Sequence, residues 1–183
     1  MITDIILVVA GALLVGVYVS WRAGRIDRLH HRVRIARSAL DVALLRRGLI
    51  ALELASSGLL DPATSLLLAG AAHEARAGGW DGDHPRELAE SNLTRALRAA
   101  FGQPGFRASL DGKDGADELL AEVEAAAHQV FLARKFYNDA VSATKDARRR
   151  PLARLLRLAG HAEMPEYFEM DDSLIGEKAD ALG

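Results

Sequence analysis

The chain has no cysteine, and aromatic residues make up only 5% of its 183 positions. The lack of cysteine excludes disulfide bonds, thiolate-bound iron–sulfur clusters and thiol nucleophiles, and it fits a reducing compartment. No segment alternates apolar and polar residues around a hairpin dipeptide, so there is no strand signal. The sequence is rich in Ala, Leu, Arg and Glu, which favour helices. We therefore predict an all-α protein.

Charged residues are absent from one long stretch, Ile5 to Trp21. A helix of about 17 residues reaches roughly 25 Å, which is enough for a short membrane span. Tyr18 and Trp21 lie at the end of the stretch, where interfacial aromatic residues are typical, and arginines follow at once. This pattern predicts a transmembrane anchor over residues 1–21.

A cleaved signal peptide and a buried core helix are the two alternatives to an anchor. A signal peptide has basic residues before its apolar run, whereas this chain begins with Asp4 as its first charged residue. The residues after the run form a poor cleavage site, and a core helix would keep a polar face that this run lacks. We therefore expect an uncleaved anchor.

Basic residues crowd only the C-terminal flank of the expected anchor. The positive-inside rule then places the N-terminus outside the cell membrane and the remaining chain in the cytoplasm. Each Lys or Arg near an anionic bilayer surface contributes about 1 kcal/mol to binding. The net charge of the whole chain is only -2, so no nucleic-acid partner is expected. The arginines expected at the membrane surface are Arg22, Arg25, Arg28 and Arg32.

Apolar residues at alternating spacings of three and four predict about four helices in an antiparallel bundle. The anchor should continue as one helix to Leu54, along a coiled-coil-like seam, because no proline interrupts it. Phe106 and Leu110 are expected to anchor the connection between the third and fourth helices. The expected helices after the first cover residues 62–77, 87–101 and 115–146. Residues 22–168 would form the bundle, and residues 169–183 an acidic, disordered tail.

Two arginines, Arg47 and Arg134, occupy positions on the apolar seams of the first and fourth helices. Burying an unpaired charge is costly, so each arginine must find a partner or extend its charged end to water. One hypothesis is a buried polar cluster that sets helix register; the alternative is that only the aliphatic stems are covered. The expected members of the cluster are Arg47, Arg134 and Asn138, with Asp41 or Glu90 as the carboxylate.

Motifs for catalysis or cofactor binding are absent from the sequence. There is no phosphate-binding loop, dinucleotide fingerprint or nucleophile elbow. The six histidines have no second ligand at a helical spacing, and the Glu-x-x-His motif of bundle metal sites does not occur. We expect no enzymatic activity, no metal and no cofactor.

Three segments resemble signatures of the LemA family: Ser38–Ile50, Ala89–Leu97 and Val130–Val141. The third is the most specific, and Arg134, Tyr137 and Asn138 stand at its fixed positions. The chain departs from the family pattern at Ala127, where Glu is usual, at Gln103-Pro104, where Tyr-Pro is usual, and at Ala51, where Pro is common. The resemblance is to a divergent member. It implies a helical bundle tethered by one N-terminal span, with no established enzymatic activity and a role in envelope organisation or stress.

These observations favour a non-enzymatic, membrane-anchored interaction or scaffold protein. Its expected partners are the lipid bilayer, an unidentified membrane or cytoplasmic protein, and a second copy of the chain. Gly11 and Gly16 offer small residues for such self-association, although not at the Gly-x-x-x-Gly spacing. The alternative is a binder of a small anionic ligand or lipid headgroup between Arg47 and Arg134. A fully paired, solvent-free cluster would favour the structural role instead.

Overall fold

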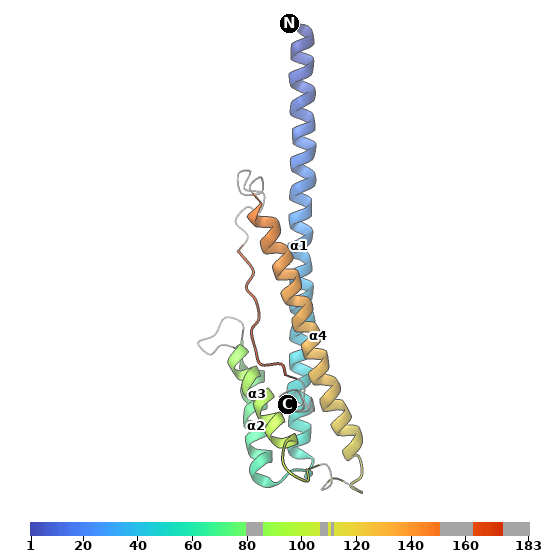
Figure 1. Cartoon of the computed structure of the whole chain (residues 1–183), viewed down its shortest axis with the longest axis vertical. Helices are drawn as coiled ribbons and strands as arrows, with labels where there is room; N and C mark the ends of the chain where they lie inside the picture. The colour runs from blue at the N-terminus through green and yellow to red at the C-terminus, as the bar shows by residue number, and fades with distance from the viewer. Residues whose placement is uncertain (80–85, 107–109, 111, 151–162, 174–183) are drawn as a thin grey trace, which may run out of the picture. The chain divides into compact units, whose positions relative to one another are not determined.

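The computed structural model describes residues 1–79, 86–106, 110, 112–150 and 163–173, except for the side chains of six residues in the first half of the N-terminal helix (Figure 1). The described residues contain four helices and no strand, which confirms the all-α prediction for this part of the chain. The helix ends agree with the expected ones to within one turn. The helices are α1 (Ile2–Ser56), α2 (Pro62–Ala77), α3 (Arg86–Phe101) and α4 (Ala116–Arg149).

The chain divides into two compact units, and α1 and α4 each contribute to both. Unit 1 comprises Met1–Arg37 and Phe136–Tyr167, and unit 2 comprises Ser38–Lys135 and Phe168–Gly183. The sequence-based division instead ended the folded part at residue 168. Unit 2 holds α2, α3 and most of the residues discussed below.

The first turn of α2 is stabilised by Asp61, as the Asp-Pro pair predicts. The Asp61 carboxylate accepts hydrogen bonds from the backbone N–H groups of Ala63 at 3.0 Å and Thr64 at 3.1 Å, and Pro62 takes the first helical position. Such a cap satisfies donors that have no partner within the helix. The helix before it, α1, ends at Ser56, and Gly58 follows with a φ of 76°. The chain therefore turns between α1 and α2 at a residue that tolerates this conformation.

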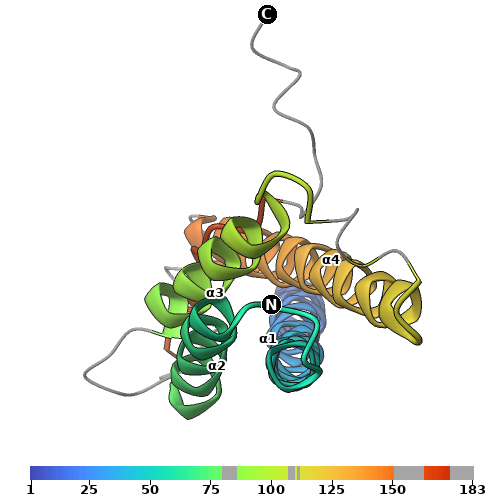
Figure 2. The same cartoon turned by 90° about the horizontal axis from the view of Figure 1, so that it is seen from below.

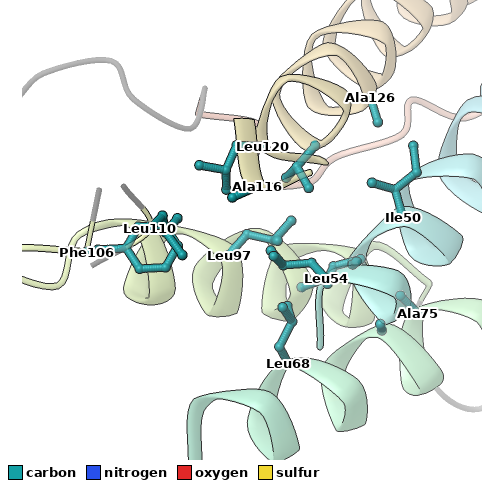
Figure 3. Close-up of a cluster of buried hydrophobic side chains, with 14 residues drawn as sticks. Ile50, Leu54, Leu68, Ala75, Leu97, Phe106, Leu110, Ala116, Leu120 and Ala126 are labelled. Carbon is teal, nitrogen blue, oxygen red and sulfur yellow. The ribbon is translucent and has the colours of Figure 1, made fainter. Parts of the chain in front are cut away.

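Unit 2 has one hydrophobic core, to which each of its helices contributes (Figure 3). Leu54 of α1 and Leu97 of α3 have no exposed surface, and Leu68 of α2 is 1% exposed. The connection between α3 and α4 adds Phe106 and Leu110, which are both buried, as expected from the sequence. In Figures 1 and 2, α2 and α3 lie side by side and antiparallel. The core fixes where α1 and α3 face each other, which positions the polar residues described below.

The first part of α1 is apolar and exposed. An 18-residue window of this helix has a mean hydropathy of 2.4, and 0% of the window is buried. One described helix is therefore long and apolar enough to span a membrane. Several large apolar side chains in this part of the helix are more than half exposed: Leu7, Leu13, Leu14, Val17 and Trp21. A helix that is hydrophobic on all sides needs either protein or lipid around it.

Gly48 lies where α1 approaches α2. A Cβ atom at this position would stand 2.8 Å from Cγ and 3.2 Å from Cδ of Arg76. Replacing Gly by Ala in a helix otherwise stabilises it by about 1 kcal/mol. Because the stem of Arg76 would have to move, we expect Gly48→Ala to lower the free energy of unfolding by about 1 kcal/mol.

The double variant Gly48→Ala/Arg76→Ala isolates this contact. The free energy of unfolding of this double variant should be about 1 kcal/mol higher than that of Arg76→Ala alone, because the two differ only in helix propensity at position 48. Urea unfolding of the full chain in detergent micelles, followed by circular dichroism at 222 nm, measures both effects. A stabilising effect of Gly48→Ala in both backgrounds would show that the approach of α1 and α2 is not tight.

Candidate functional site

A buried ion pair joins α1 to α3 in unit 2. Arg47 Nη2 donates to Glu90 Oε2 at 2.6 Å, and the side chains of the two residues are 3% and 1% exposed. The same nitrogen donates to the backbone carbonyl of Glu90 at 3.1 Å. Nη1 donates to the Thr94 hydroxyl at 3.0 Å, and that hydroxyl donates to the Glu90 carbonyl. Both terminal nitrogens of Arg47 are thus held by one turn of α3.

A second ion pair extends this arrangement towards the edge of unit 2. Arg86, one helical turn before Glu90, donates from Nη1 to Asp41 Oδ1 on α1 at 2.6 Å. Its Nε lies 3.8 Å from Glu90 Oε1. The two cations and two carboxylates form one neutral network. We call Asp41, Arg47, Arg86, Glu90 and Thr94 the buried network.

Burial dominates the electrostatics of Glu90. It raises the pKa of this carboxyl above its ordinary value, while the positive charges of Arg47 and then Arg86 oppose the rise. A carboxyl with a raised pKa binds a proton more readily in the folded state than in the unfolded one. Arg47 therefore compensates for the loss of water around Glu90 only in part.

Arg134 lies in a different set of contacts from Arg47. Its Nε donates to Asp172 Oδ2 at 2.8 Å, and its Nη2 lies 2.5 Å from the same oxygen. The single cluster expected from the sequence is thus replaced by two networks, because each arginine has its own carboxylate partner. Asn138 is half-buried on α4, in unit 1. Of the expected cluster, the structure brings Arg47, Asp41 and Glu90 together.

The partner of Arg134 belongs to a segment that the sequence analysis assigned to a disordered tail. Phe168 is 1% exposed and Met170 9%, whereas Glu169 between them is exposed. The backbone N–H of Asp171 donates to the Ser91 hydroxyl at 3.0 Å, and the Asp171 carboxylate pairs with Arg98. The disorder prediction is thus wrong for 169–173, because two apolar side chains and two paired carboxylates hold the segment on unit 2. Residues 174–183 lie outside the described part.

We call 168–173 the tail segment. Within it, hydrogen bonding from the Ser173 hydroxyl lowers the pKa of Asp171, burial opposes this change, and the charge of Arg98 adds to it. A lowered pKa means that the carboxylate form favours the folded state. This contribution is present at neutral pH and is lost as the pH falls through the lowered pKa. Since Asp171 and Arg98 are each more than a third exposed, solvent weakens their ion pair.

The arginines expected at the membrane surface lie on α1, directly after its apolar part. Arg25, Arg28 and Arg32 are exposed, and their spacing of three and four residues places them along one side of the helix. The side chain of Arg22 lies outside the described residues. These exposed arginines belong to unit 1.

Sequence reasoning missed Arg86, Thr94 and the carboxylates of the tail segment. A local signal existed for the first two, since Arg86, Glu90 and Thr94 recur at a spacing of four on α3 and must share one face. No local signal connects Arg134 with Asp172, which lies 38 positions further along the chain. Among the described residues, no group of three His, Asp or Glu side chains is placed to hold a metal ion.

A comparison of the chain with protein-family models finds no match. Searches of curated proteins and of solved structures likewise return no significant match. The resemblance to LemA proteins therefore remains a prediction from three sequence segments.

Proposed function

We propose that the chain is a single-span, membrane-anchored interaction protein of the LemA type, without enzymatic activity. The observation that carries this proposal is the continuity of α1 (Ile2–Ser56). One unbroken helix carries an exposed apolar part, then exposed arginines, then the buried network. This order along the chain places a basic segment directly after a possible membrane span, as expected of an anchored protein.

In this proposal, the N-terminus lies outside the cell, the chain after residue 21 lies in the cytoplasm, and residues 22–168 form an antiparallel bundle of about four helices. The exposed Arg25, Arg28 and Arg32 support this orientation, because positive charge next to a span favours the cytoplasmic side. The protein would organise the envelope or respond to stress by binding other proteins near the inner leaflet. It would need no metal and no cofactor.

The alternative function, binding of an anionic ligand at Arg47 and Arg134, gains no support from the contacts. Arg47 is buried and already bonded to a carboxylate, a hydroxyl and a carbonyl. Arg134 is held by Asp172. A phosphate would have to displace these partners, so the geometry favours a structural role for both arginines.

The topology can be tested with single cysteines, because the chain has none of its own. Thr3→Cys at the N-terminus should react with a membrane-impermeant maleimide in intact cells. Ala121→Cys, an exposed position on α4, should react only after permeabilisation. A reporter that is active only in the cytosol, fused after Gly183, should be active. Labelling of Ala121→Cys in intact cells would overturn the proposed orientation and make unit 2 an outward-facing binder.

A further inference from the structure

Helix α1 carries apolar side chains on two opposite faces within unit 2. One face packs into the core through Leu40, Leu44 and Leu54, which are at most 1% exposed. On the other face, Val42 is 62%, Leu45 45% and Leu49 53% exposed. The core therefore does not account for the second apolar face.

The second face has the spacing of a coiled coil. Val42 and Leu49 are seven residues apart and take position a of a heptad, and Leu45 takes position d. Leu52, at the next d position, is half-buried and packs against the core of unit 2. In the sequence, Ile35 continues the a position by one heptad towards the N-terminus. A β-branched residue at a, such as Val42, with Leu at d, such as Leu45, favours two parallel strands, and Leu49 departs from this preference. We call Val42, Leu45 and Leu49 the apolar stripe.

The charges beside the apolar stripe also fit a parallel pair. Asp41 precedes Val42 and takes position g, and the exposed Arg46 takes position e. In a parallel two-stranded coiled coil, position g of one helix faces position e of the following heptad in the other. Asp41 would face Arg46 of the partner subunit, and two-fold symmetry repeats the pair. Asp41 keeps 32% of its side chain exposed while it holds Arg86.

We infer that the apolar stripe is the interface for a second copy of this chain, which pairs with it in parallel along α1. This inference rests on the proposed function, because two anchors in one bilayer hold both helices in the same direction. A coiled coil this short is marginal in isolation. Confinement to the membrane raises the effective concentration of the second helix and offsets the cost of association.

Disulfide cross-linking of the full chain in liposomes tests this interface. Val42→Cys and Leu49→Cys are each compared with the exposed Ala121→Cys on α4, under the same mild oxidant. The substituted side chains are exposed, so folding should be unaffected. We expect each stripe variant to form homotypic dimers at least tenfold faster than the control. Equal rates at all three positions would overturn the inference.

A charge variant adds an independent measurement. Arg46→Glu in the Val42→Cys background would place Glu opposite Asp41 of the partner subunit, whereas Arg46→Lys keeps the attraction. We expect the Glu variant, and not the Lys variant, to slow cross-linking severalfold. The same slowing in both variants would contradict a g–e pair and with it the parallel register.

Failure of the inference and failure of the proposed function give different results. Carbonate extraction of the same samples shows whether the chain spans the bilayer. A chain that stays in the membrane and does not cross-link at residues 42 and 49 contradicts only the dimer. A chain that carbonate releases contradicts the anchor. The released chain is also tested in a mixture of the Val42→Cys and Leu49→Cys variants. If this mixture yields disulfide-linked dimers of one variant with the other, the helices pair antiparallel and the inferred parallel dimer is wrong.

Discussion

Replacing Arg47 with Met lowers the free energy of unfolding by about 3–5 kcal/mol at neutral pH, the range for removing one partner of a buried ion pair. Methionine has a similar length and fills the space of the arginine stem without strain. The loss is electrostatic, because Glu90 remains 1% exposed and its carboxylate keeps only the more distant Arg86 as a cation. Urea unfolding of the full chain in detergent micelles measures this change.

The destabilisation by Arg47→Met should depend on pH with a defined sign. Burial already raises the pKa of Glu90, and Arg47 is the largest influence that opposes the rise. Without Arg47 the folded-state pKa rises further above the unfolded-state value. A raised pKa adds stability that is complete below the unfolded-state pKa and is lost as the pH increases through the folded-state pKa. The variant should therefore lose less stability at pH 5 than at pH 8.

The double variant Arg47→Met/Glu90→Met separates a structural role from a binding role. If the pair only holds α1 against α3, removing both charges recovers most of the stability, since buried ion pairs are often replaceable by apolar side chains. Asp41 and Arg86 still pair in this variant. A double variant as unstable as Arg47→Met would contradict this view of the pair. A matched control is Lys135→Met, an exposed cation on α4 in unit 2, which should change stability by less than about 0.5 kcal/mol.

Helical periodicity determined which parts of the buried network could be predicted. The spacing of apolar residues on α1 placed Arg47 among core positions, and the cost of a buried charge then required a carboxylate. Asp41 or Glu90, as alternative partners, followed from that requirement. The arrangement of the two carboxylates could not be predicted from the sequence. Arg86 contacts both Asp41 and Glu90, and this depends on how α3 is rotated against α1. Periodicity gives the face of a helix, but not the residue that faces it.

The contacts of Arg134 could not be predicted for another reason. Its partner lies in a short extended segment of acidic composition, and acidic composition by itself indicates disorder. The apolar content of the segment is two residues, Phe168 and Met170, which is too short for any periodicity to be recognised. The second apolar face of α1 was not predicted either, because the seam through Leu40 and Leu54 already accounts for how one face of this helix is buried.

Replacing Phe168 with Ala destabilises unit 2 by about 3–4 kcal/mol, the usual cost of removing a fully buried phenylalanine. Phe168 is 1% exposed, so the truncation leaves a cavity or releases the tail segment from unit 2. The matched control is the adjacent, exposed Glu169→Ala, which should have an effect below about 0.5 kcal/mol. Urea unfolding of the full chain in micelles gives both values, and equal effects of the two variants would contradict the burial of Phe168.

The comparison of Phe168→Ala with Asp172→Asn then shows what holds the tail segment in place. Asp172 and Arg134 are partly exposed, at 17% and 23%, so their ion pair should contribute no more than about 1 kcal/mol and should weaken in high salt. The contribution of Phe168 is hydrophobic and should not weaken in 1 M NaCl. If stability falls more in Asp172→Asn than in Phe168→Ala, charge holds the segment. It could then be released by ionic strength, which would make the end of the chain a salt-sensitive part of unit 2. With the expected order, the burial of Phe168 holds the tail segment on unit 2, and it should do so independently of salt.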